Sequence, residues 1–399
     1  MVSTAPLKAQ FLLRDDVTYL GFGSFGACPR PIFDDYQKWQ LELETEPVQF
    51  ITVNGPVYLQ RSRQALAAYL NCNADDLVYT TNPSYAINII AKSFPLKAGD
   101  EILSTNFEYG ALDRTWNYYC KKAGAKFVRQ PISLPLTTKE KFIEEFFKGL
   151  SSKTKAIFIS EITSSTALRF PVKEICEIAI EKGLFTIVDG AHSPGHIDID
   201  LAKLKADVYT GACHKWMMAP KGCSFLYVKK EHQHLFDPLV VSWGYEAAFP
   251  SNSQFLDYHQ MQGTRDFSAF LTVPKALEFM RQHNWKEISV QCKKLARDNY
   301  QRFCDLLGTE PLCPISEEFL GQMCSMRIHT EEPEKLQRLL FEKYRIEIPV
   351  MRHEEHRFIR YSLQAFNNQN DLDILYQALS DIITSTDLIQ VKGKNKNNS

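Results

Sequence analysis

The sequence predicts an α/β protein with two parts: a large domain built on a mainly parallel sheet and a smaller α+β domain at the C-terminal end. Three short apolar runs, at residues 184–188, 207–210 and 223–228, have the length and β-branched content of strands buried on both faces. From about residue 268 the pattern changes to a long helical stretch, alternating strand-like stretches and a closing amphipathic helix. This change predicts a domain boundary near residue 267.

The length and charge of the chain favour an enzyme that acts on small molecules. A chain of 399 residues is long enough for two domains. Its 46 basic and 47 acidic residues give a net charge of −1, so no overall field attracts nucleic acid or an anionic membrane. No apolar run approaches the ~18 residues that span a bilayer, and the first residues lack the apolar core of a signal peptide. We therefore expect a cytoplasmic location.

The ten cysteines indicate reduced thiols. They are scattered without a CxxC pair, in a chain large enough to fold without disulfides, which favours the cytoplasm and argues against a zinc site. His353 and His356 are three residues apart, which differs from the HExxH spacing, and no third ligand is evident. We therefore expect no metal.

Four segments follow from the pattern of composition. We expect an N-terminal arm at residues 1–17, a large domain at 18–267, a small domain at 268–390 and a disordered tail at 391–399, because the tail is short, polar and basic.

In the first half of the large domain, the sequence predicts a glycine-rich turn at Gly23-Ser24-Phe25-Gly26, either a plain turn or one that lines the substrate site, and helices at 34–50 and 57–70. A strand at 77–80 precedes a helix that Asn82 caps and in which Pro83 takes the first position. The free N–H groups at the start of such a helix bind phosphate.

The second half of the large domain continues the alternation of strands and helices. Strands are expected at 101–105 and 156–162, and helices at 139–150 and after Pro171. In the small domain a helix at 286–307 precedes the strand-like stretches MCSMRIHT and RIEIPVMR.

Four polar side chains follow two of the buried strands. Asp189 and His192 follow the first run, and His214 and Lys215 follow the second. Ligands of open α/β sheets bind outside the carboxyl ends of the strands, so these side chains are expected to converge. A carboxylate, two imidazoles and an amine in one place suit a Schiff-base lysine and a pyridinium cofactor.

The stretch VDGAHSPGHIDID, followed by GACHKWMMAPKGCSFLYV, resembles the pyridoxal-phosphate site of fold-type I, class V aminotransferase-like enzymes, and within them the isopenicillin N epimerase-like branch. The resemblance covers about residues 18–370. It implies the fold of PLP-dependent transferases (fold type I), with a seven-stranded sheet in the large domain, and pyridoxal 5′-phosphate (PLP) as the cofactor.

The resemblance also implies roles for the four convergent residues. Lys215 is the Schiff-base lysine, and Asp189 pairs with the protonated ring nitrogen of the cofactor. His192 is placed to bond the 3′ oxygen of the ring, and His214 lies near the phosphate or above the lysine. The serine that many relatives carry three residues before the lysine is Ala212 in this chain, so one phosphate contact is missing or comes from elsewhere.

Further site residues follow from matching segments. The resemblance implies that Asn82-Pro83-Ser84 holds the phosphate, that Tyr109 lies over the ring and that Ser164 contacts the cofactor. Gly263 and Thr264, in a GTRD segment, are expected to reach the cofactor of the other subunit in a homodimer. Arg360 is expected to bind the substrate α-carboxylate bidentately.

The reaction itself stays open between several types. Epimerisation at Cα through Lys215 needs a second acid, for which Tyr109, His214 and a water are candidates. A β-eliminating carbon–sulfur lyase and an aminotransferase are the alternatives, and a PLP-binding protein without catalysis is a distant one. A cysteine desulfurase is disfavoured because no cysteine lies between Cys324 and Arg360 and Cys324 itself falls in an apparent strand. The sequence does not name the substrate.

Overall fold

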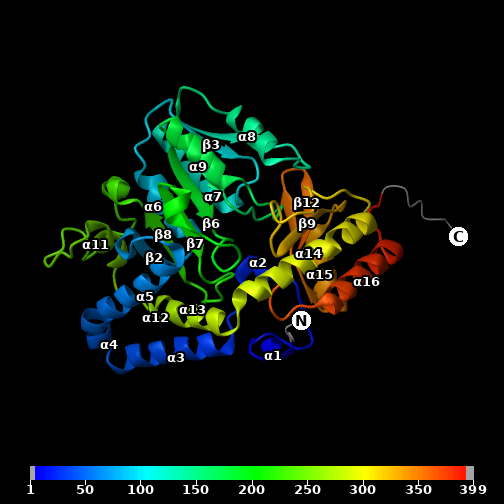
Figure 1. Cartoon of the computed structure of the whole chain (residues 1–399), viewed down its shortest axis with the longest axis horizontal. Coiled ribbons are helices and arrows are strands. Elements are labelled where there is room, and N and C mark those ends of the chain that lie inside the picture. The colour runs from blue at the N-terminus through cyan, green and yellow to red at the C-terminus, as the bar shows by residue number, and fades with distance from the viewer. Residues whose placement is uncertain (1–4, 392–399) are drawn as a thin grey trace.

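The large part of the molecule is built on a seven-stranded sheet (Figure 1). The computed structural model describes residues 5–391, so residues 1–4 of the expected arm and 392–399 of the expected tail lie outside the described residues. The strand order is β2-β8-β7-β6-β5-β3-β4. The strands are β2 Leu77–Thr80, β3 Glu101–Thr105, β4 Lys126–Gln130, β5 Thr154–Ser160, β6 Phe185–Gly190, β7 Val208–Ala212 and β8 Ser224–Val228.

All pairings in this sheet are parallel except those of β8, which runs antiparallel to both β2 and β7. The prediction of a mainly parallel, seven-stranded sheet is confirmed. The predicted strand at 156–162 was placed two residues late, because β5 begins at Thr154 and ends at Ser160.

Successive residues of the central strands are buried on opposite faces of the sheet, as the pleat requires. Phe158, Ile187 and Val208 belong to one apolar cluster with α6 (Pro83–Ser93) and α7 (Gly110–Ala123). Val188 and Tyr209 belong to the other cluster, which includes α5 (Gly55–Leu70) and α9 (Val172–Glu181). Helices therefore cover both faces, which explains why the strands read as continuous apolar runs.

The C-terminal lobe contains a separate three-stranded antiparallel sheet in the order β11-β12-β9. Its elements are α14 Trp285–Leu307, β9 Met323–Arg327, α15 Pro333–Tyr344, β10 Ile346–Glu347, β11 Val350–His353, β12 His356–Ser362 and α16 Gln369–Ser385. The expected α+β character is confirmed. The expectation of one strand over RIEIPVMR is wrong, because Pro349, which cannot donate to a ladder, separates β10 from β11.

Residues near the N-terminus pair with this lobe. β1 (Thr18–Tyr19) runs parallel to β10, and Gly21 forms a bridge with Ser362. The segment expected to be loop-like at 23–26 is more regular than predicted, since Phe22–Phe25 form a single helical turn, α2, ended by Gly26 at φ 66°. This segment therefore reaches the edge where the two lobes meet.

The helices α3, α12 and α13 lie along the lower side of the large part in Figure 1, whereas α8 lies near its top and α11 at its left. The predicted helix at 34–50 begins earlier and is interrupted at Pro47, so that α3, α4 and a π-helical turn precede α5. α12 and α13 pack against α3 and α5. These elements are α3 Arg30–Thr45, α4 Pro47–Gln49, α8 Lys139–Phe147, α11 Gln254–Gln260, α12 Ser268–Leu271 and α13 Val273–Gln282. Among the described helices, none is long and apolar enough to cross a membrane.

Candidate active site

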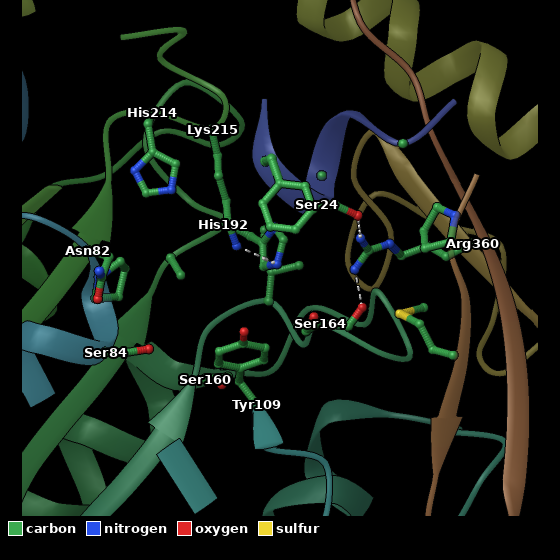
Figure 2. Close-up of a pocket in the computed structure, with 18 of the residues that line it drawn as sticks. Ser24, Asn82, Ser84, Tyr109, Ser160, Ser164, His192, His214, Lys215 and Arg360 are labelled. Atoms are coloured by element: carbon green, nitrogen blue, oxygen red, sulfur yellow. Dashed lines mark hydrogen bonds between the residues drawn. The ribbon is translucent and has the colours of Figure 1, made fainter. Parts of the chain in front are cut away.

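A cavity of about 700 Å³ opens at the carboxyl ends of β5, β6 and β7, next to α2, the start of α6 and β12 (Figure 2). The expected convergence at the strand ends is thus observed. The predicted site residues that line the cavity are Asn82, Pro83, Ser84, Tyr109, Ser164, Asp189, His192, His214, Lys215 and Arg360. In Figure 2, Asn82 and Ser84 lie on one side and Arg360 on the other, with Lys215 and His192 between them.

Lys215 lies in the turn after β7, and two glycines fix the backbone of that turn. A Cβ on Gly26 would lie 2.2 Å from the carbonyl oxygen of His214, and one on Gly195 would lie 2.3 Å from that of Trp216. Both glycines have positive φ, which side chains rarely tolerate. The turn is therefore held from two directions, a constraint that the sequence motif did not reveal.

His192 connects Lys215 to the core below it. The indole Nε1 of Trp216, which can only donate, lies 3.4 Å from Nδ1 of His192, and Nε2 of His192 lies 3.3 Å from Nζ of Lys215. Burial holds the pKa of His192 well below its ordinary value, and the charge of Lys215 lowers it further. The neutral ring therefore carries its proton on Nε2 and donates to an uncharged amine on Lys215.

The electrostatic surroundings of Lys215 favour that uncharged amine. Burial lowers its pKa from 10.5 to about 8, Asp189 opposes this shift and Arg360 adds to it. A free amine is the form that attacks a carbonyl. The site thus keeps a larger share of Lys215 uncharged near neutral pH than an exposed lysine would have.

Asp189 is a buried carboxylate at the end of β6. It is 4% exposed, and its Oδ1 accepts a hydrogen bond of 2.9 Å from the N–H of Ala191. Burial raises its pKa to about 6, while the Ala191 N–H and Lys215 act in the opposite direction. No ion pair within 4 Å involves it among the described residues. A cationic heterocycle in the cavity would supply the missing partner.

The start of α6 provides a place for an anion. Asn82 caps the helix by accepting a 2.8 Å hydrogen bond from the N–H of Tyr85, Pro83 takes the first turn, and that turn carries no acidic residue. The positive end of the helix dipole and the Ser84 hydroxyl face the cavity. This arrangement suits a phosphate.

His214 is held by a hydrogen bond to Cys223, the residue before β8. Its Nδ1 lies 2.9 Å from the carbonyl oxygen of Cys223, which can only accept, so Nδ1 carries the proton. Burial lowers its pKa to about 4. The neutral imidazole therefore presents Nε2 as an acceptor, which suits a base or a partner for a protonated group.

Arg360, from β12, is a buried cation without an anionic partner among residues 5–391. It is 1% exposed, it donates to the carbonyl oxygen of Ser164 and to Oγ of Ser24 at 3.1 Å, and its Nε has no partner. Burial lowers its pKa to about 10. A buried guanidinium that meets only neutral acceptors is costly, so this site favours an incoming carboxylate.

α2 brings Ser24 to this arginine because Gly23 allows a close approach. A Cβ on Gly23 would lie 2.4 Å from Sδ of Met323 and 2.9 Å from Oγ of Ser362. Ser24 lies in the segment for which the sequence left a plain turn and a substrate-lining role open, and it lines the cavity. Ser164 meets Arg360 through its backbone carbonyl.

Two predicted groups stand differently from the rest. Tyr109 lines the cavity directly before α7 and is 48% exposed, so its ring has an open face. Gly263 and Thr264 are exposed and do not line the cavity of their own chain. They lie near α6, since Gln262 accepts a 2.9 Å hydrogen bond from the hydroxyl of Tyr85.

The residues considered for metal or thiol chemistry have other partners. His353 bonds the carbonyl oxygen of Asn106 at 2.7 Å through Nε2 and contacts Ser165 through Nδ1. Within residues 5–391, no group of three or more metal-binding side chains is found. Cys324 is fully buried in β9, and burial raises its pKa to about 12. Its thiol is therefore unreactive.

Fold and site together define a PLP-dependent enzyme, because a desolvated lysine, a buried carboxylate and a helix-end anion site converge at the strand ends. The chain belongs to the class V aminotransferase family, whose model matches residues 57–375. These residues fit PLP, with Asp189 available to a ring cation and α6 available to a phosphate.

Relatives of two reaction types match most of the chain. It is 31% identical to an isopenicillin N epimerase of Amycolatopsis lactamdurans, covering 96% of this chain and all of that one. It is 24% identical to an L-cysteine desulfhydrase of Arabidopsis thaliana, covering 92% and 88%. A solved cysteine desulfurase from Thermococcus onnurineus NA1 superimposes with a TM-score of 0.82 at 18% identity, covering 96% and 98%. This last likeness concerns the fold.

The depressed pKa of Lys215 predicts how PLP uptake depends on pH. Only the uncharged amine reacts, so the rate of PLP capture by apoenzyme should rise with pH through about 8 and then level off. Asp189→Asn removes a charge that raises the pKa of Lys215, so the midpoint should move to lower pH. Stopped-flow absorbance on both proteins measures this, with Lys215→Ala as the blank. A midpoint near the ordinary lysine value of about 10.4 would contradict the assignment.

Proposed function

We propose that this chain is an isopenicillin N epimerase-like enzyme that removes and returns the Cα proton of an amino acid or of an amino-acid-like side chain. The observation that carries this proposal is the unpaired, buried Arg360 facing a desolvated Lys215 across one cavity. The Arg360 guanidinium suits the α-carboxylate of a substrate, and the Lys215 amine suits removal of the proton at Cα. The 31% identity to an isopenicillin N epimerase over 96% of the chain supports the epimerase type.

Each residue of the cofactor region is assigned a binding role in this proposal. Asp189 pairs with the ring nitrogen, the Nε2–H of His192 donates to the ring oxygen, and Asn82-Pro83-Ser84 cradles the phosphate with the start of α6. When bound, PLP supplies an electron sink for the pair left at Cα. Asp189 serves this sink because a buried carboxylate keeps a nearby heterocycle protonated.

Arg360 orients the substrate in this scheme. Its fork points into the cavity from β12, and the bonds to Ser24 and to the Ser164 carbonyl fix the plane of the guanidinium (Figure 2). A substrate whose carboxylate binds Arg360 bidentately keeps one free rotation. The position of the substrate amino group near Lys215 fixes that rotation. The Cα–H bond then faces the Lys215 amine.

An epimerase also needs a proton source on the opposite face. Figure 2 shows Lys215 and Tyr109 approaching the centre of the cavity from opposite sides. We assign the second acid to the Tyr109 hydroxyl, with His214 Nε2 as the competing group. Tyr109 is half exposed and so can exchange its proton with solvent.

A β-eliminating carbon–sulfur lyase is the second candidate. The identity to an L-cysteine desulfhydrase supports it, and this reaction needs only Lys215 as a base. A desulfurase reaction is disfavoured by the buried Cys324.

We also propose that the enzyme is a homodimer in which Gly263 and Thr264 reach the partner's cofactor. Large apolar side chains are exposed along two segments: Leu41, Val48 and Val53 in one, and Val241, Trp243 and Phe249 in the other. Gln40 bonds Asp266 at 3.0 Å and Phe50 stacks on Phe267, so the first segment lies next to the residues that follow Gly263 and Thr264. An apolar surface of this kind marks a protein interface.

Isotope exchange tests the reaction. In deuterated water with a panel of amino acids and amide-extended amino acids, we expect deuterium at Cα together with loss of optical purity, and no product in Lys215→Ala. Pyruvate and ammonia released from cysteine would instead identify the lyase, and an oxo-acid would identify the transaminase. Tyr109→Phe should slow inversion more than exchange, because exchange on one face needs only Lys215. Mass spectrometry and chiral chromatography provide the two readouts.

Arg360→Ala should weaken substrate binding without loss of the cofactor. The loss of a charge-assisted, bidentate contact corresponds to about 1.5–3 kcal/mol, so KM should rise on the order of 10- to 100-fold. Arg360→Lys keeps the positive charge but loses the planar fork of N–H donors. Its KM should lie between that of the wild type and that of Arg360→Ala. Initial rates and the absorbance of bound PLP are measured together. Unchanged KM in the alanine variant would refute the carboxylate role.

The proposed dimer predicts a specific response to charge on the apolar surface. The wild type should sediment at twice 45.9 kDa, and Trp243→Glu with Phe249→Glu should shift it towards monomer and weaken PLP binding, since Thr264 of the partner is lost. Ile180→Glu, on the exposed face of α9, is the matched control and should stay dimeric. Analytical ultracentrifugation with PLP titration measures both effects. A monomeric wild type that binds PLP tightly would exclude the shared site.

A further inference from the structure

A second buried carboxylate, Glu108, lies directly behind the cavity wall. It is 4% exposed, immediately precedes Tyr109 and follows β3. Sequence reasoning gave it no role, since a lone glutamate after a strand is ordinarily a surface residue. In the structure it forms no ion pair with any basic side chain that is described.

Three donors converge on the Glu108 carboxyl group. Oε1 accepts from the hydroxyl of Thr105 at 2.7 Å, and Oε2 accepts from both the N–H and the hydroxyl of Ser160, at 3.0 and 2.5 Å. The hydroxyl oxygen of Thr105 accepts from the N–H of Phe107 at 3.1 Å, so its own hydrogen is directed at Glu108. Every group in this network donates towards Glu108, which is the pattern that a carboxylate anion requires.

Ser160 connects this carboxylate to the cofactor region. It lines the cavity at the end of β5, and it is the residue in register with Asp189 on β6. Glu108 is hydrogen-bonded to Ser160. Asp189, the carboxylate assigned to the ring nitrogen, lies on the neighbouring strand, and neighbouring strands are about 4.8 Å apart. The charge that faces Glu108 is that of Asp189.

Burial raises the pKa of Glu108 to about 7, the donors from Ser160 and Thr105 act against this, and the charge of Asp189 raises it further. Two buried like charges disfavour each other. A cation next to Asp189 removes that penalty and leaves Glu108 ionised. The two carboxylates therefore respond together to a positive charge in the cavity.

We propose that Glu108 is a positioning residue whose negative charge, acting through Asp189 and Ser160, strengthens the hold of the site on a protonated cofactor ring. The proposal rests on the assignment of Asp189 to the ring nitrogen. It adds a second carboxylate to the electrostatics of the site, so the field at the ring is set by a pair of acids. Ser160 keeps that pair at a fixed separation.

Glu108→Gln tests the charge while conserving the shape. The amide oxygen can accept from Ser160, and the amide NH₂ can donate to the second lone pair of Thr105. In the holoenzyme, the pH midpoint of the PLP absorption band should fall by about 1 unit, because loss of a nearby anion destabilises the protonated form. The dissociation constant of PLP at pH 8 should rise about tenfold. The kcat for exchange of the Cα proton should fall, and KM should not change.

Controls separate this effect from loss of stability. Asp207 is a buried carboxylate of the same sheet that also accepts from an N–H and a hydroxyl of one residue, Thr186, but it precedes β7 at the opposite end of the strands. Asp207→Asn should destabilise the fold without moving the PLP midpoint. Glu108→Asp, which restores the charge, should return the midpoint towards the wild-type value.

Two outcomes would overturn the inference: a PLP midpoint in Glu108→Gln equal to that of the wild type, or an equal shift in Asp207→Asn. If Glu108→Gln does not fold, Thr105→Val gives the same information. It keeps the carboxylate but removes one donor to the anion, so the midpoint should fall by a smaller amount, and an unchanged midpoint would reject the role. Asp189→Asn distinguishes the underlying assignment. A shift there without one in Glu108→Gln would reject only the role of Glu108.

Discussion

The site depends on ionisable groups that the protein buries without pairing them with groups of opposite charge. Lys215, Asp189 and Arg360 all face one cavity, and no ion pair within 4 Å joins any two of them. Burial of an unpaired charge costs several kcal/mol. The fold tolerates this cost because the large sheet and its two apolar clusters supply most of the stability. The cavity therefore attracts a ligand with a cationic ring, an anionic phosphate and an anionic carboxylate.

The backbone holds these groups apart, and close contacts at glycine make that possible. Gly26 and Gly195 contact the Lys215 turn from two directions, and Gly23 brings α2 against β12. An ion pair with Asp189 would raise the pKa of Lys215, and the structure holds the two groups without such a pair. The same rigidity keeps Arg360 between Ser24 and the Ser164 carbonyl. These steric contacts thus keep the buried ionisable groups apart, and the proposed chemistry depends on that separation.

The sequence predicted the convergence of Asp189, His192, His214 and Lys215 because a parallel sheet places its strand ends at one edge. Asn82 and Pro83 were equally predictable, since helix caps have a local signature. Gly195 and Glu108 were not, because their importance comes from contacts with residues far away in the chain. The break at Pro47 and the separation of β10 from β11 were missed for a different reason. Proline marks an interruption, but the apolar pattern around it continues.

The arrangement of donors around the site also bears on which reaction follows proton removal. A lyase needs its base on the same side as the leaving group and gains little from a second acid. An epimerase needs proton donors on both faces and a carbanion that survives until the second donor acts. In the proposed scheme, Asp189 faces the ring nitrogen and Glu108 lies behind it, so the two carboxylates together keep the electron sink cationic. Tyr109 follows Glu108 directly and precedes α7, so one short segment carries both the second carboxylate and the proposed second proton donor.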